Sequence, residues 1–238
     1  MQLAHRLFLM AVVCAAIGVP LGIASWVAQG PLPGDAAVTR GLQTLFGADP
    51  GWASALTATA KPPWVWATVT VGMALAYLKS GWRGAFAVPA VFLLARLMDL
   101  GLREAIYVPK PDADLVPIAS PSDSSGLPST FGLVFGTVFG AAAWFPRVSI
   151  SRWPTAPRGL SAAATVAAIV LLVAGLCCRV VLGGHWFSQM TASLLTAFAL
   201  TLLAGWVIWA WRQPAETLMN DVAATPAEPA PAVATPAN

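Results

Sequence analysis

The stretch Cys178-Arg179-Val180-Val181-Leu182-Gly183-Gly184-His185-Trp186-Phe187-Ser188-Gln189 separates two long apolar runs of this chain. An arginine ends the first run, two glycines interrupt the pattern, and a histidine opens the second run. Only 10% of all residues are charged, so two ionisable side chains at such a boundary are unusual. Because ionisable groups in or beside a bilayer are costly, Arg179 and His185 become candidate functional residues.

The composition around this stretch is typical of an integral membrane protein. Of the 238 residues, 58% are hydrophobic, and the mean hydropathy is +0.72. These values exclude an ordinary soluble protein. The net charge of +3 indicates positive loops at a cytoplasmic membrane face, and we expect no nucleic acid partner.

The cysteines indicate neither a disulfide nor a metal site. Cys14, Cys177 and Cys178 all lie in apolar runs, their number is odd, and no metal-ligand spacing occurs. We interpret them as small core residues, and we expect no metal and no cofactor.

Apolar runs long enough to cross a bilayer recur along the chain. A bilayer core needs about 20 apolar residues of helix. The runs of this kind cover residues 7–27, 64–78, 85–102, 131–145, 160–181 and 190–211. The sequence therefore predicts an all-α integral membrane bundle of six transmembrane helices in residues 1–212. The Ala/Pro-rich segment 213–238 cannot bury a core, and we expect a disordered cytoplasmic tail there.

Three further features of the chain complete this prediction. The run 7–27 exceeds the roughly 7–15 apolar residues of a signal peptide, the competing interpretation, so we expect it to stay as a membrane anchor. Residues 30–62 form a mixed linker whose amphipathic pieces, 36–46 and 52–60, should lie at the membrane interface. Arg96 and Asp99, spaced i and i+3 within one run, should pair inside the bundle, because unpaired charges there are costly.

The distribution of lysine and arginine predicts the topology. These residues mark the cytoplasmic side of a membrane. Segment 147–158 contains three arginines and no acid, so both termini should be cytoplasmic. One group of polar residues then falls together on the external face: Arg103, Lys110, Ser129, Arg179 and His185.

The chemistry of this group suits an anion. Arg103, Lys110 and Arg179 are cations, and guanidinium groups bind phosphate through two hydrogen bonds. Pro128 stands near the start of a helix, whose free N–H groups could cradle an anion, and Ser129 adds a hydroxyl. The alternatives are cations that reach to the lipid headgroups and a serine that only caps its helix.

His185 is the candidate nucleophile. Gln189 follows it by one helical turn, so the two side chains can touch. The amide carbonyl of Gln189 could accept the Nδ1 proton and leave Nε2 free to attack. The alternative is a structural histidine that contacts lipid headgroups.

Three motifs carry a resemblance to a known family. They are Arg103-x6-Lys110-Pro111, Pro128-Ser129-Thr130-Phe131 and Arg179-x5-His185-x3-Gln189. Together they resemble the signature of the type 2 phosphatidic acid phosphatase superfamily, which includes bacterial undecaprenyl-diphosphate phosphatases. The resemblance implies a metal-independent lipid phosphatase or phosphotransferase in the bacterial inner membrane, with its active site on the periplasmic side.

The resemblance also implies roles for individual residues. The cations, together with Ser129 and Thr130, would hold the phosphoryl group of a membrane lipid such as an isoprenyl diphosphate. His185 would attack this group and form a phosphohistidine, and Gln189 stands where the family has the orienting carboxylate.

Several positions depart from the family pattern. Phe131 replaces the histidine that protonates the leaving group, Thr130 replaces a glycine, Gln189 replaces an aspartate, and Cys178 replaces a serine. One acid of the same outer loop could substitute as the proton donor: Glu104, Asp112, Asp114 or Asp123. A diphosphate needs this proton least, because its leaving group is a phosphate monoester with a second pKa of about 6. The alternative function is a catalytically inactive relative that binds a phosphorylated lipid.

Overall fold

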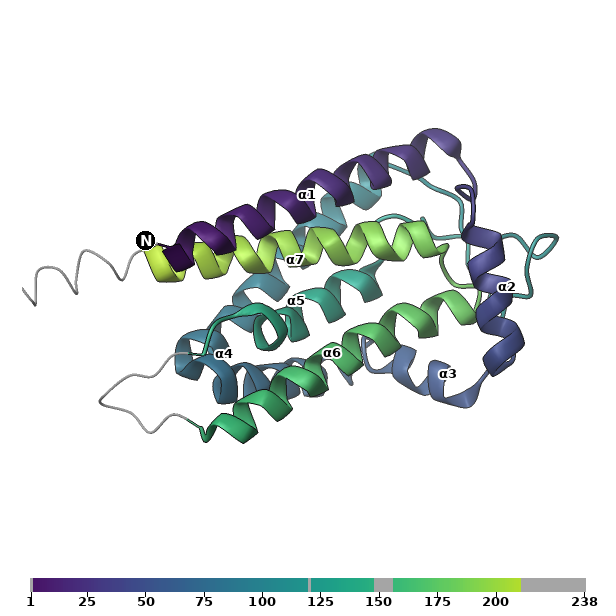
Figure 1. The fold of residues 1–238 in the computed structure, drawn as a ribbon. Coiled ribbons are helices and arrows are strands. Elements are labelled where there is room, and N and C mark those ends of the chain that lie inside the picture. Colours follow the sequence, from purple (N-terminus) through teal and green to yellow (C-terminus); the bar gives the residue numbers. More distant parts are fainter. Residues whose placement is uncertain (1, 120, 148–155, 211–238) are drawn as a thin grey trace, which may run out of the picture.

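The computed structural model describes residues 2–119, 121–147 and 156–210 (Figure 1). This part of the chain forms helices and contains no strand. In chain order the helices are α1 (Gln2–Ala28), α2 (Asp35–Phe46), α3 (Gly51–Ala58), α4 (Val65–Ala105), α5 (Thr130–Trp144), α6 (Arg158–Val181) and α7 (Phe187–Ala210). The predicted all-α class is confirmed for the described residues. The expected tail, 213–238, lies outside them.

Long apolar helices dominate the bundle. By length and composition, α1, α4, α6 and α7 can each cross a membrane, and α5 is a shorter apolar helix of 15 residues. A helix satisfies its own backbone hydrogen bonds, which a bilayer interior requires. The chain is therefore described as a multi-pass membrane protein. Six spanning helices are not shown among the described residues, because two of the predicted runs lie in the single element α4 and α5 is shorter than a typical span.

Helix α4 is a hairpin with two arms. A straight helix of 41 residues would be about 60 Å long. However, Lys61, which precedes α4, and Arg103, near its end, line the same cavity. The chain reverses at Gly81, whose φ of 68° lies in the left-handed region that glycine adopts without strain. The two arms correspond to the predicted runs 64–78 and 85–102.

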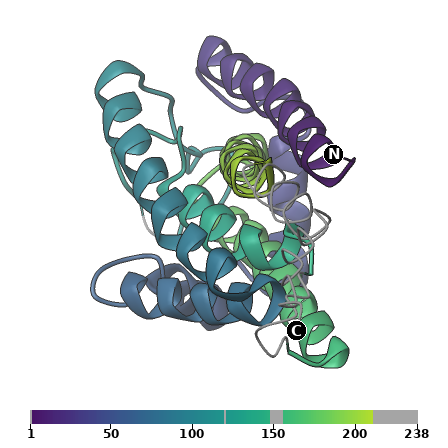
Figure 2. The same cartoon turned by 90° about the vertical axis from the view of Figure 1, so that its left-hand side faces the viewer.

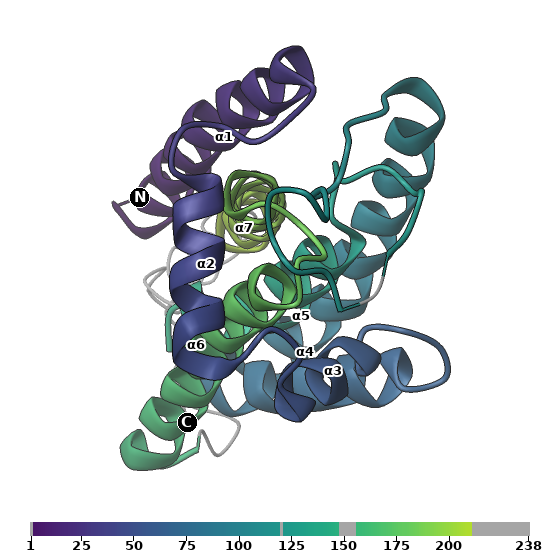
Figure 3. The same cartoon turned by 90° about the vertical axis from the view of Figure 1, so that its right-hand side faces the viewer.

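Helix α7 lies between α1 on one side and α5 on another (Figures 2 and 3). The approach of α5 to α7 is close because α5 carries glycines four residues apart on this face. These glycines and the α7 residues that they meet are Gly132 with Ser193, Gly136 with Ala197, and Gly140 with Thr201. Small residues allow helix backbones to approach closely in a membrane, where van der Waals packing drives association.

The short helices α2 and α3 cover the end of the bundle where α6 ends and α7 begins (Figure 3). They correspond to the two amphipathic pieces that the sequence places in the linker. Asp35, the first residue of α2, is buried, and its carboxylate accepts hydrogen bonds from the backbone N–H and the hydroxyl of Ser188 (2.8 and 2.6 Å). Ser188 lies in the first turn of α7, so α2 is attached to the start of that helix.

The expected pair inside the bundle is confirmed. Arg96 forms an ion pair with Asp99, and Arg103 forms a second one with the same carboxylate, from Nε to Oδ1 at 2.8 Å. Asp99 is only 1% exposed, and two cations therefore compensate its buried charge.

Candidate active site

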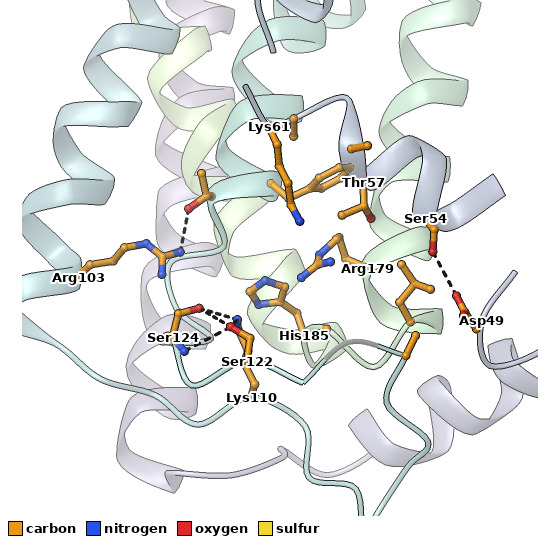
Figure 4. Close-up of a pocket in the computed structure, with 17 residues that line it drawn as sticks. Asp49, Ser54, Thr57, Lys61, Arg103, Lys110, Ser122, Ser124, Arg179 and His185 are labelled. Carbon is orange, nitrogen blue, oxygen red and sulfur yellow. Dashed lines mark hydrogen bonds between the residues drawn. The ribbon is translucent and has the colours of Figure 1, made fainter. Parts of the chain in front are cut away.

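A cavity of about 480 Å³ opens at the end of the bundle that α2 and α3 cover (Figure 4). Its walls come from α3, the second arm of α4, the start of α5, the end of α6 and the loops between them. Among the predicted site residues, those that line it are Arg103, Lys110, Thr130, Arg179 and His185. Segments that lie far apart in the sequence, from Asp49 to His185, thus meet around one space. Ser129 and Gln189 lie behind its wall.

The imidazole of His185 is buried and held on both ring nitrogens. Nδ1 lies 2.9 Å from the carbonyl oxygen of Gly126, which can only accept, so Nδ1 carries the proton. Nε2 lies 3.2 Å from the hydroxyl of Ser129 and is the acceptor in the neutral ring. The prediction that the Gln189 side chain accepts the Nδ1 proton of His185 is wrong, because the backbone carbonyl of Gly126 is the acceptor.

Gln189 instead ties three backbone segments together. Its Oε1 accepts from the backbone N–H of Trp186 at 3.2 Å, and its Nε2 donates to the carbonyl of Pro109 at 2.7 Å. An added Cβ at Gly126 would lie 2.6 Å from Gln189 Oε1, so the amide also packs against the loop that holds His185. Gln189 therefore acts on the histidine through the position of Gly126.

Ser129 begins α5 and is fully buried. Its hydroxyl accepts the N–H of Gly132 at 3.3 Å, which is an ordinary N-cap, and also faces His185. Of the two alternatives that the sequence left open for Ser129, the helix cap is present in the structure. The serine reaches the cavity through the imidazole and does not line the wall itself.

Arg179 supplies a cation without a partner in the described part of the chain. Its Nε is buried with no acceptor, and no described carboxylate pairs with the guanidinium. Gly184 lies directly beneath it, since an added Cβ there would be 2.5 Å from one terminal nitrogen of Arg179. Buried polar groups are normally satisfied, so an unsatisfied guanidinium on a cavity wall indicates a place for an anion.

Arg103 is largely engaged by the protein. Besides Asp99, it donates to the carbonyl of Pro128 at 2.7 Å and to the hydroxyl of Thr130 at 2.8 Å. Thr130 in turn donates to Asp99 at 2.8 Å. Thr130 thus joins the ion pair of α4 to the start of α5. Arg103 lines the cavity, and its hydrogen bonds connect α4 to the start of α5.

Lys110 lies in the loop after α4 and points into the cavity (Figure 4). Its ammonium donates to the hydroxyls of Ser122 and Ser124 at 3.0 and 2.6 Å. Burial lowers the pKa of Lys110 to about 8, and the charges of Arg179 and Arg103 act in the same direction. The carboxylate of Asp123 acts on this ammonium only from a distance, and no described carboxylate forms an ion pair with it, so it is also available to an anion.

The same environment keeps His185 neutral. Burial, followed by the charges of Arg179 and Lys110, holds the pKa of His185 well below its ordinary range. Desolvation and nearby cations both disfavour the protonated ring. The arrangement thus offers an unprotonated Nε2 beside unpaired cations, which is suited to attack on an anionic phosphoryl group.

The cavity offers little acid chemistry. Phe131 lines it, is 6% exposed, and stacks on Phe135 with ring centroids 4.2 Å apart. Among the described residues, the one carboxylate on the wall belongs to Asp49, which is exposed and accepts a hydrogen bond from Ser54. None of the acids suggested from the sequence lines the cavity: Glu104, Asp112, Asp114 and Asp123.

Sequence reasoning missed several residues of this site. Lys61 lines the cavity from the segment between α3 and α4, and the only signal for it was its place among the cations of the same bundle end. The carbonyl of Gly126 had no signal, because any residue has a carbonyl. The partners of Lys110 were hidden in a serine-rich loop whose folding the motifs do not specify.

The comparisons with known proteins return one similar structure. No family model matches the sequence, and no curated protein matches it. The fold is similar to the crystal structure of a transmembrane PAP2-type phosphatidylglycerolphosphate phosphatase from Bacillus subtilis. The identity is 18% and the TM-score is 0.46, over 90% of this chain and 98% of that one.

Proposed function

We propose that this chain is a metal-independent membrane phosphatase or phosphotransferase that acts on a lipid diphosphate through His185. In this proposal the chain is a divergent member of the type 2 phosphatidic acid phosphatase superfamily. The observation that carries the proposal is the half-buried guanidinium of Arg179, whose buried Nε has no acceptor among the described residues, beside a neutral imidazole. The first recruits an anion, and the second can attack it.

The reaction has two steps in this proposal. Nε2 of His185 bonds to the terminal phosphorus, and the bond from phosphorus to the bridging oxygen breaks, releasing a lipid monophosphate. Water then attacks the phosphohistidine, the P–N bond breaks, and the electron pair returns to the imidazole. Both protons of the water remain with the phosphate product. The Gly126 carbonyl stabilises the transient positive ring by accepting from Nδ1.

The leaving group decides between lipid diphosphates and lipid monophosphates. A monophosphate would have to expel an alkoxide, whose conjugate acid has a pKa near the ~16 of water. The phosphate leaving group of a diphosphate has a pKa of about 6 and departs without a proton. Phe131 cannot donate one, so the cavity wall favours the diphosphate.

Phosphate release from detergent-solubilised protein tests the proposal. Isoprenyl diphosphate and isoprenyl monophosphate would be compared without added metal. We expect release from the diphosphate, and a loss of about a thousandfold or more in His185→Ala. His5→Ala, which changes the only other histidine, is the matched control. Unchanged turnover in His185→Ala would refute the mechanism.

A second candidate, an inactive relative that binds a phosphorylated lipid, is favoured by two observations. Phe131 stands where the family has its acid, and the Gln189 side chain is turned away from His185. Such a protein would bind vanadate, lose this affinity in Arg179→Ala, and release no phosphate. Hydrolysis that appears only in the double variant Phe131→His with Gln189→Asp would support this candidate.

The proposed enzyme crosses the bacterial inner membrane six times, counting both arms of α4 and the short α5. Both termini are cytoplasmic, and the cavity faces the periplasm. The cations at the opposite end of the bundle support this orientation, since Lys79 and Arg83 flank the α4 kink and Arg147 follows α5.

A further inference from the structure

The cavity extends beyond His185 to a wall that the three motifs do not include. This wall consists of α3 and the segment after it, and it contributes Ser54, Thr57 and Lys61 (Figure 4). A single phosphoryl group held by Arg179 and His185 leaves this second part of the space unfilled. The outer part is polar and carries a cation of its own.

Lys61 is the cation of the outer wall. Its side chain is exposed at the mouth of the cavity, and its ammonium points toward the space above Arg179 and His185 (Figure 4). No residue in the described ranges accepts a hydrogen bond from it or forms an ion pair with it. Its charge also reaches Lys110, because it contributes to the lowered pKa of that ammonium.

A charge balance indicates the size of the anion. Arg103 lines the cavity and shares the Asp99 carboxylate with Arg96, so this cluster keeps one net positive charge, which offsets the Asp49 carboxylate on the cavity wall. The other lining cations have no ion-pair partner among the described residues: Lys61, Lys110 and Arg179. A phosphate monoester carries about −1.5 to −2 at pH 7. A diphosphate monoester adds about −1 for its inner group and reaches about −2.5 to −3, which matches three cations.

We propose that Lys61 binds the inner, lipid-linked phosphoryl group of a diphosphate, while Arg179 and His185 hold the terminal one. This inference rests on the proposed function. The inner group is the leaving group of the reaction. An ammonium beside it stabilises the negative charge that develops as the bridging bond breaks. The positive charge of Lys61 thereby stabilises the leaving group, as a proton donor would otherwise do. It also gives the enzyme its preference for diphosphates over monophosphates.

The geometry of the chain fits this assignment. Lys61 is exposed at the mouth, on the segment that leads into the apolar helix α4, whereas Arg179 is half-buried and His185 is buried. A lipid whose tail stays in the bilayer must enter with its terminal phosphate first. The lipid-linked phosphate therefore remains at the mouth, within reach of Lys61.

Anion binding to the solubilised full chain tests this subsite without relying on turnover. Isothermal titration would compare inorganic diphosphate with orthophosphate for the parent, Lys61→Gln and Lys61→Arg. We expect Lys61→Gln to weaken diphosphate binding by about tenfold or more while orthophosphate affinity changes less than about twofold. Lys61→Arg should restore most of the loss. Lys79→Gln, which changes a lysine outside the cavity, is the matched control.

The outcomes separate this inference from the proposed function. Equal losses for both anions in Lys61→Gln, or no loss for either, would overturn the role of Lys61 and leave the Arg179–His185 site intact. A parent that binds neither anion would overturn the proposed function itself. The same variants should show the selective loss in kcat/KM for isoprenyl diphosphate over isoprenyl monophosphate.

Discussion

At the scale of single residues, the site works through side chains whose charge the protein leaves uncompensated. Lys110 contacts only hydroxyls, and Arg179 has a buried nitrogen without an acceptor. The protein places a neutral histidine between them. Binding of an anion should therefore depend on each cation in a way that pH and substitution can reveal.

Lys110 should set the alkaline limit of activity. Its ammonium is charged below its pKa of about 8 and neutral above it, so anion binding is lost as the pH rises through this value. We expect kcat/KM to fall above about pH 8 in the parent. Lys110→Arg should move this fall to higher pH, because a guanidinium stays protonated. A pH profile of phosphate release measures both, and an identical alkaline limb in parent and variant would contradict the assignment.

Gly184 should be required for the position of Arg179. An added Cβ would lie 2.5 Å from the guanidinium and must push it out of place. We expect Gly184→Ala to weaken vanadate binding about tenfold or more, the scale of one lost charged hydrogen bond. Gly41→Ala is a matched control, since nothing lies within 4 Å of the added Cβ there. Normal vanadate affinity in Gly184→Ala would show that the guanidinium does not hold the anion.

At the scale of elements, the start of α7 is fixed from outside by α2. The carboxylate of Asp35 receives two hydrogen bonds from Ser188 and one from the backbone N–H of Leu32 at 2.8 Å. Negative charge is favourable at a helix N-terminus, where N–H groups are unpaired. Because His185 precedes α7 by two residues, this contact also positions the site.

Removal of this cap should destabilise the bundle. Asp35→Ala leaves buried donors of Ser188 and Leu32 unpaired, and we expect a loss of about 1–3 kcal/mol in the free energy of unfolding. Asp35→Asn keeps one acceptor oxygen and should lose less. Thermal unfolding in detergent measures the order of the variants, with Asp114→Ala as an exposed control. Equal stability of Asp35→Ala and the parent would exclude the cap as a source of stability.

At the scale of the whole molecule, the hairpin of α4 brings both of its ends to the cavity and leaves its kink at the opposite end of the bundle. If the bundle spans a membrane, the loop after α4 and the kink therefore face different compartments. Exposed positions are present on each side, Asp114 in the loop and Trp82 beside the kink.

Labelling from outside the cell should distinguish the two ends. In a variant without Cys14, Cys177 and Cys178, a cysteine in Asp114→Cys should react with a membrane-impermeant maleimide in intact cells. A cysteine in Trp82→Cys should react only after the membrane is opened. Labelling of both positions in intact cells would contradict a crossing by the second arm of α4, and the reverse pattern would invert the proposed topology.

The sequence by itself determined the helices. Apolar runs and their charged boundaries predicted the long apolar helices approximately, with the runs 64–78 and 85–102 falling on the two arms of α4, because a bilayer forces an apolar backbone to satisfy its hydrogen bonds locally. The motif spacings also selected four residues that line the cavity: Arg103, Lys110, Arg179 and His185. These are properties of neighbouring residues, which a single sequence displays.

Only the tertiary structure decided the partners. Gln189 is one turn from His185, yet the Gly126 carbonyl, 59 residues away, took the Nδ1 proton. Arg103 was expected to hold phosphate, and in the structure it donates hydrogen bonds to Asp99 and Thr130. Lys61 lines the cavity although it belongs to none of the three motifs. A hydrogen bond goes to whichever group the packed helices place at the right distance, and this placement depends on the reversal at Gly81 and on the small residues between α5 and α7, not on adjacency in the chain.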